Sequence, residues 1–180
     1  GNVEFSYQVS DSIKFIQTEP TSLTTGARQN SDFEKAVSDG KYIYVPTHIE
    51  GSQLDGDSSK TCFLLEKYTL QGQLIWQSEK IGSSGNSAVG ALNFTESGDL
   101  LWAIPVSKNG ISEESTLFKV NAKDGEEIWE STFTGRPSDI AVKGNQVYLG
   151  GISGDGFNQN NNAFIAAFNA YTGDISWAKN

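Results

Sequence analysis

The sequence is poor in the residues from which most catalytic and metal-binding sites are built. Of its 180 residues, one is histidine (His48), one is cysteine (Cys62) and none is methionine. A single cysteine excludes an internal disulfide, and the chain shows no zinc-ligand spacing, glycine-rich phosphate loop or paired-carboxylate motif. Acyl transfer would need His48 to be paired with a nucleophile, and no pattern specifies such a pair. We therefore predict a protein that is not an enzyme, with no catalytic residue and no bound cofactor.

Positive charge and long apolar stretches are also scarce. Thirteen Lys and Arg residues stand against 22 Asp and Glu residues, which gives a net charge of −9. Nucleic acids and anionic membranes both require clustered basic residues, so neither is an expected partner. No apolar run approaches the ~18 residues of a membrane span, so no membrane insertion is expected. Neither a first methionine nor a signal peptide is present, and we expect a processed, excised or partial chain.

Glycine is plentiful, with 19 residues, and it marks a repeat of the chain. Three segments end alike: YTLQGQLIWQSE (68–79), NAKDGEEIWEST (121–132) and NAYTGDISWAKN (169–180). In each segment a glycine precedes a tryptophan by four residues, in the pairs Gly72 and Trp76, Gly125 and Trp129, and Gly173 and Trp177. The three tryptophans lie 53 and 48 residues apart. Repeats of this length are typical of stacked structural units, so the repeat is stronger evidence for the fold than any local pattern.

Each unit reads as four short strands, which we denote A to D. A short apolar stretch, a glycine-containing turn and a continuous apolar run come first, as in DIAVKGNQVYLGG (139–151). A longer polar loop, a third strand, a tight turn and the tryptophan strand follow. Continuous apolar strands such as LLWAI (100–104) indicate burial on both faces of the sheet. The pattern predicts an all-β fold of β-propeller blades, each a four-stranded antiparallel sheet.

We expect three complete blades at residues 31–80, 86–133 and 136–180, within one propeller segment that spans 1–180. Residues 7–19 align with 68–80, with Phe15 opposite Trp76, so residues 3–19 look like the last two strands of a preceding half blade. Propellers close with about four to eight blades, so we expect a part of a larger propeller or assembly.

The last strand of each unit resembles the tryptophan-docking repeat of quinoprotein-like propellers, Ala-x-Asp-x-x-Thr-Gly-x-x-x-Trp. Ala167, Asn169, Thr172, Gly173 and Trp177 fit it, with Asn in place of Asp. The whole unit 138–177 is also similar to the bacterial repeat named for seven-bladed propellers. That resemblance rests on Asp139, Ile140, Ala141, Val142, Gly144, Asn145, Val147, Tyr148, Gly151, Ala163, Phe164, Ala166, Gly173 and Trp177. It implies that Trp76, Trp129 and Trp177, with Gly72, Gly125 and Gly173, are structural residues packed between adjacent blades.

The long loops give the candidate binding face. The loops between strands B and C span 46–61, 105–115 and 151–162, on the face opposite the tight turns, and long loops on a rigid scaffold often bind ligands. Asp55 and Asp57 have the alternating oxygen spacing of calcium loops, and Asp155 lies in a second oxygen-rich loop, so both are weak calcium candidates. The binding-face residues are His48, Asp55, Asp57, Asp155, Phe157 and Asn158.

We predict a non-enzymatic scaffold or binding module of a secreted or cell-surface protein. Its partner would be a protein, the remaining blades or a glycan. Asn93 begins the sequon Asn-Phe-Thr, a candidate glycosylation site in an extracytoplasmic setting. Two alternatives remain open: a part of a quinoprotein-like or hydrolytic propeller enzyme whose catalytic residues lie elsewhere, and a subunit of an extracellular filament or assembly.

Overall fold

The computed structural model describes residues 36–50, 60–83, 90–105, 114–153 and 162–179. Every regular element in these ranges is a β-strand. The strands form three four-stranded antiparallel sheets, each a simple meander, which we call blades I, II and III. The predicted half blade at 3–19 lies outside the described residues.

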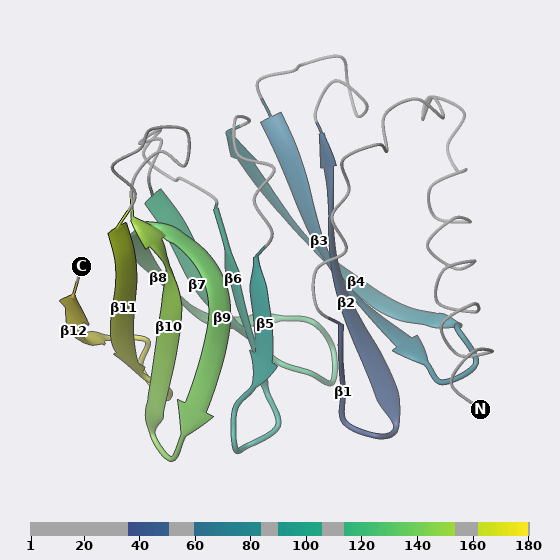
Figure 1. Ribbon diagram of the computed structural model, residues 1–180. Helices are drawn as coiled ribbons and strands as arrows, with labels where there is room; N and C mark the ends of the chain where they lie inside the picture. The colour runs from purple at the N-terminus through teal and green to yellow at the C-terminus, as the bar shows by residue number, and fades with distance from the viewer. Residues whose placement is uncertain (1–35, 51–59, 84–89, 106–113, 154–161, 180) are drawn as a thin grey trace.

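The three blades have the following bounds. Blade I contains β1 (Val37–Ser38), β2 (Tyr42–Glu50), β3 (Lys60–Thr69) and β4 (Leu74–Ser83); blade II contains β5 (Ala91–Phe94), β6 (Leu100–Ile104), β7 (Glu114–Val120) and β8 (Glu127–Thr134); blade III contains β9 (Arg136–Lys143), β10 (Gln146–Ser153), β11 (Asn162–Asn169) and β12 (Ile175–Lys179). Figure 1 shows the sheets side by side and face to face, with blade II in the middle. The all-β fold of β-propeller blades is thus confirmed.

Two apolar cores hold the sheets together, and both lie between blades. The first packs Phe63 and Leu65 of blade I on Leu92 and Trp102 of blade II. The second packs Leu117 and Phe133 of blade II on Leu149 and Phe164 of blade III, among other residues. Blade II therefore buries both of its faces against a neighbouring blade, which explains the continuous apolar run of β6.

The sequence predicted that His48 lies in a loop, but the structure places it in strand β2. Strand β2 continues to Glu50, and His48 pairs with Phe63 of β3, whose ring centroid lies 6.1 Å from that of His48. The prediction ended the strand at Val45 and began the loop at Pro46, a residue type that is rare within central strands. Strand β1 pairs with β2 only at Ile43 and Tyr44, so at Pro46, which lies opposite Leu65 of β3, β2 has a described neighbour on one side only.

Candidate interaction surfaces

The interface between blades I and II is built on a tryptophan that lies against a glycine. Gly125, in the turn between β7 and β8, has a φ of 79°, a left-handed conformation that favours glycine. A Cβ atom placed on Gly125 would lie 2.8 Å from Cε3 of Trp76. The indole ring can therefore lie on the turn only because Gly125 has no side chain.

The same turn offers a backbone carbonyl to three donors of blade I. The Ala122 carbonyl accepts hydrogen bonds from Lys67 Nζ at 2.6 Å, from Trp76 Nε1 at 3.4 Å and from Tyr44 Oη at 3.4 Å. Lys67 is only 5% exposed, and its ammonium group stands 4.1 Å from the centroid of the Tyr42 ring. A ring face is a favourable environment for a cation that has left water.

Asp39 completes the polar side of this interface. Its carboxylate accepts backbone hydrogen bonds from Lys41 and Tyr42 and a side-chain hydrogen bond from Tyr44. Burial raises the pKa of Asp39, but these hydrogen bonds and the charge of Lys67 outweigh burial, so its pKa lies below the ordinary value. Asp39 is therefore ionised at neutral pH and lies where it can balance the charge of Lys67.

The interface between blades II and III repeats the contact with different polar partners. A Cβ atom on Gly173 would lie 2.7 Å from Cε3 of Trp129. Lys119, 6% exposed, donates to the Ala170 carbonyl at 3.3 Å and pairs with Asp99 at 3.2 Å. The indole contact is thus used twice, as the resemblance implied, and each time a lysine lies beside it.

Asn93, the predicted glycosylation site, contributes to the same interface. Its side-chain amide donates a 2.7 Å hydrogen bond to the Ile140 carbonyl of blade III, and its side-chain oxygen accepts from Phe94 N. The hydroxyl of Thr95, the other essential sequon residue, bonds to Ser97 and Asp99. A glycan on Asn93 would have to replace the interblade hydrogen bond, so glycosylation of the folded chain stays a prediction that this geometry opposes.

The outer face of blade III carries the third tryptophan of the repeat, and no described blade packs on this face. Trp177 is 40% exposed, and its ring centroid lies 6.3 Å from that of Tyr148 at an interplanar angle of 49°. The β-sheet register places Ile152 and Ile165 on the same face, each 43% exposed. This face therefore presents two aromatic rings and two large aliphatic side chains to the solvent.

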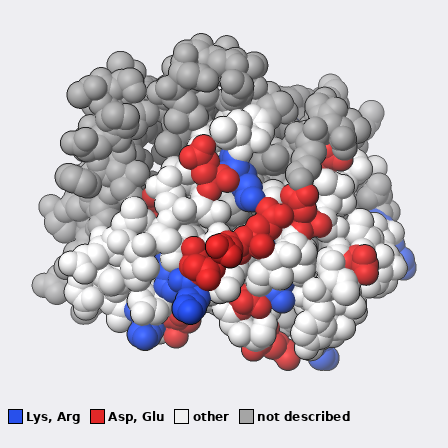
Figure 2. All heavy atoms as spheres, turned by 180° about the vertical axis from the view of Figure 1, so that it is seen from behind, with Lys and Arg blue, Asp and Glu red and all other residues white. Residues whose placement is uncertain are grey.

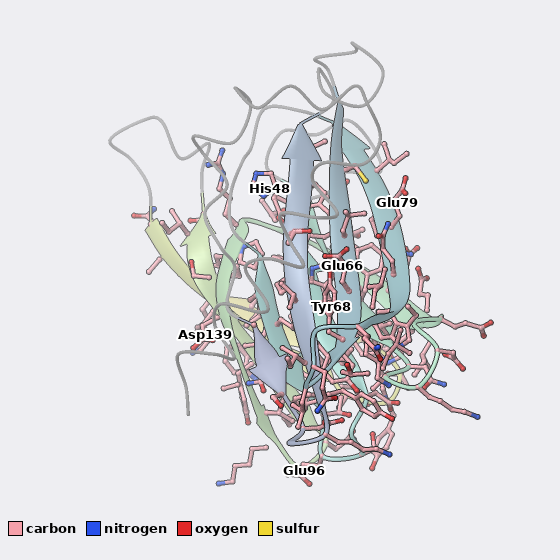
Figure 3. All side chains as sticks on the ribbon, turned by 90° about the vertical axis from the view of Figure 1, so that its right-hand side faces the viewer. His48, Glu66, Tyr68, Glu79, Glu96 and Asp139 are labelled. Atoms are coloured by element: carbon pink, nitrogen blue, oxygen red, sulfur yellow. The ribbon has the colours of Figure 1, made fainter. Side chains whose placement is uncertain are left out.

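Titratable groups gather on the opposite end of the stack, on the face of blade I that is turned away from blade II. Figure 3 shows Glu66, Tyr68 and Glu79 on this sheet. Glu66 is 1% exposed, and burial raises its pKa to about 7. The Tyr68 hydroxyl lies beside it and partly offsets this effect, although no hydrogen bond between them meets the usual limits of distance and angle. Burial and the charge of Glu79 raise the pKa of Cys62 to about 12, which makes this thiol unreactive at neutral pH.

The remaining predicted site residues fall in parts of the chain that the structure does not describe. Asp55, Asp57, Asp155, Phe157 and Asn158 lie outside the described residues, so the calcium sites and the binding-face loops stay predictions. Within the described ranges, no group of three His, Cys, Asp or Glu residues could hold a metal ion. In those ranges there is also no helix of the length and apolar character that crossing a membrane would require. Figure 2 shows acidic side chains in a band across one face, as the net charge of −9 predicts.

Sequence reasoning missed the two lysines. Lys67 and Lys119 occupy the same place in their blades, because β-sheet pairing sets Lys67 opposite Trp76 and Lys119 opposite Trp129. Blade III has Ala167 opposite Trp177. The signal was available in the sequence, as a charged residue in an apolar strand at a nearly constant distance before the tryptophan.

Comparisons with known proteins give no family for the chain. No family model and no curated protein matches it. Twenty-three chains of solved structures match, among them cobalt-substituted apocarotenoid oxygenase from Synechocystis, with 10% identity and a TM-score of 0.47 over 83% of this chain and 37% of that chain. A point mutant of that enzyme gives 9% identity, a TM-score of 0.45 and the same coverage. BamB from Moraxella catarrhalis is 17% identical, with a TM-score of 0.44 over 84% of this chain and 48% of that chain. The chain thus spans less than half the length of these proteins, and likeness at this level assigns no activity.

Proposed function

We propose that this chain is a non-enzymatic β-propeller module that binds a protein partner through the outer face of blade III, as part of a secreted or cell-surface protein. The observation that carries the proposal is the Tyr148–Trp177 pair. Its ring separation of 6.3 Å and angle of 49° nearly equal the 6.1 Å and 52° of Tyr44 and Trp76. The latter pair holds the Ala122–Gly125 turn of blade II, so the outer face already has the arrangement of an occupied interface.

The partner that fits this face is a β-sheet that presents a glycine turn of the same kind. Indole and phenol rings supply large apolar areas with one polar atom each, as is common where proteins meet. A second copy of the chain is a poor candidate, because the corresponding turn of blade I, Thr69–Gly72, is one residue shorter than the turns that start at Asn121 and Asn169. We therefore expect a different sheet to cover Trp177.

The test extends the chain by a second copy of residues 86–134, the blade that packs on Tyr44 and Trp76. We expect the added blade to cover Trp177 and to protect its fluorescence from acrylamide, in a background where every other tryptophan, including the two in the added copy, is replaced by phenylalanine. A matched extension carries valine in place of the glycine that corresponds to Gly125. Equal quenching of Trp177 in the unextended chain and in both extended chains would overturn the proposed binding face.

The extracytoplasmic setting needs a separate experiment. Fractionation of the source cells should place the parent protein outside the cytoplasm, and recovery in the cytosolic fraction alone would refute this part of the proposal. The binding face and the location are thus tested independently.

A further inference from the structure

Two buried lysines stand where the tryptophan-docking pattern has alanine. Blade III follows the pattern with Ala167, whereas blades I and II have Lys67 and Lys119 at the position opposite the tryptophan. Both lysines are more than nine-tenths buried, although lysine is almost never fully buried without a specific partner. Their presence therefore needs a reason other than packing.

Each lysine donates a hydrogen bond from its ammonium group to the neighbouring blade. Lys67 Nζ reaches the Ala122 carbonyl and Lys119 Nζ reaches the Ala170 carbonyl. In both neighbours this alanine follows an asparagine and precedes the glycine under the indole ring by three residues. Tryptophan and lysine thus bind two points of the same turn, one by shape and one by a directed hydrogen bond.

An aspartate of the lysine's own blade is near each ammonium group. Asp99 lies 3.2 Å from Lys119 Nζ, and Asp39 acts on Lys67 through its charge. Both aspartates come from the turn between the first two strands, although from different positions in it. In blade III the corresponding turn, Lys143–Gln146, contains no acidic residue. Blade III therefore lacks both the lysine opposite the tryptophan and the aspartate that accompanies it.

Stability alone does not explain these lysines. Burial lowers the pKa of Lys67 below its ordinary value, although Tyr42 and Asp39 oppose the change, which means that the folded environment disfavours its charge. Buried charged groups of this kind often contribute little net stability and instead restrict which arrangement of the surrounding elements is acceptable. Two apolar sheet faces can slide on each other, whereas an ammonium group accepts only a carbonyl at one place.

We propose that Lys67 and Lys119 are positioning residues that fix the register of each blade on the next, by requiring a carbonyl three residues before the glycine that receives the tryptophan. Each acts through the turn of its neighbour and has no contact with a ligand. The outer face of blade III has Ala167 in this place, so no lysine selects the blade that covers it, and the glycine turn that receives Trp177 is what remains to do so.

The test uses the complete chain labelled with 5-fluorotryptophan, in which each ¹⁹F line is assigned by replacing one tryptophan with phenylalanine. Lys67→Met keeps most of the volume of the side chain and removes the donor. We expect the Trp76 line to broaden or split while the Trp129 line stays unchanged, and Lys119→Met should give the reverse. Lys143→Met, an exposed lysine of blade III, should change neither line.

These outcomes separate positioning from a merely structural role. Loss of packing or of overall stability would move both lines in both variants, and that result overturns the proposal, as does an unchanged Trp76 line in Lys67→Met. If a variant does not fold, acetylation of the unmodified chain gives a second test. Lys67 and Lys119 should react about tenfold or more slowly than Lys143 because their amines are held in the interfaces, and equal rates would overturn the proposal.

Discussion

The I–II interface and the outer face of blade III carry the same two rings in nearly the same arrangement, one pair covered and the other exposed. Tyr44 and Trp76 lie against the turn of blade II, whereas no described residue covers Trp177. The ring geometry is nevertheless preserved, with centroids 6.1 and 6.3 Å apart. Strand pairing within one blade therefore sets the rings in place, and the neighbouring blade is received by a surface that is already formed. Such preorganisation lowers the cost of binding.

The largest expected effect is the difference in stability between chains that lack the ring of Trp76 and chains that lack the ring of Trp177. Trp76→Ala removes a ring that packs on the turn of the next blade, and we expect a loss of about 3 kcal/mol in the free energy of unfolding. Trp177→Ala removes a ring that is 40% exposed, and its cost should be about 1 kcal/mol. Urea denaturation of the two variants gives the comparison. Similar losses for both would mean that the outer face of blade III is covered in the isolated chain.

The glycine under the indole ring provides a second contrast. Gly125→Ala places a methyl group 2.8 Å from Cε3 of Trp76, in a backbone conformation that L-residues rarely adopt. Strain and steric overlap together should cost about 3 kcal/mol. Gly98→Ala is the matched control, since its φ of 88° is similar but no atom lies within 4 Å of the new Cβ. Its cost should be about 1 kcal/mol, and the difference measured by urea denaturation reports the contact with Trp76 alone.

The sequence predicted these contacts because they follow from a repeated spacing. The spacing of a glycine four residues before a tryptophan, three times over, gave the repeat, and the resemblance to tryptophan-docking propellers implied that Trp76 and Trp129 pack between blades. The fold class followed from the same repeat. Both predictions depend on residue types that have few structural alternatives, namely the largest side chain and the smallest.

The lysines and the end of β2 could not be predicted in this way. A lysine in a strand is normally solvated, and only the pairing of Lys67 with Trp76 shows that it lies within an interface. Pro46 usually ends a central strand, and nothing in the sequence showed that β2 would continue to pair with β3 as far as Glu50. The burial of the lysines and the length of β2 both depend on which residues lie opposite each other in neighbouring strands, and this is known only once the strands are assembled into sheets.

Glu66 offers a test that acts on blade I without altering its interface with blade II. Its folded-state pKa of about 7 lies above the value of 4.5 expected for an unfolded chain. The folded chain therefore holds its proton more tightly, so the stabilising contribution is full below pH 4.5 and is lost as the pH rises through 7. We expect the titration of Glu66 to lower the free energy of unfolding, measured in urea, by about 2 kcal/mol as the pH rises from 5 to 8.

Glu66→Gln is the variant that isolates this effect. It should remove this part of the pH dependence and make the chain more stable than the original at pH 8, because a neutral amide replaces a buried carboxylate. Glu126→Gln, an exposed residue of blade II, is the control and should leave the pH profile unchanged. A profile that keeps its slope in Glu66→Gln would show that another group titrates in this range.

The smallest expected effect concerns Asn93, whose side chain either forms a hydrogen bond between blades II and III or carries a glycan. Its amide joins blade II to the Ile140 carbonyl at 2.7 Å, so Asn93→Ser should leave that carbonyl without this donor and cost about 1 kcal/mol in the free energy of unfolding. A glycan on this nitrogen would replace one of its two hydrogens and place a sugar ring between blades II and III, where this hydrogen bond forms. We therefore expect mass spectrometry of the chain expressed through a secretory pathway to find Asn93 unmodified. Complete glycosylation at unchanged stability would mean that Lys119, Trp129 and the apolar core hold blades II and III together without help from Asn93. The II–III interface would then resemble the exposed outer face of blade III more than its contacts indicate.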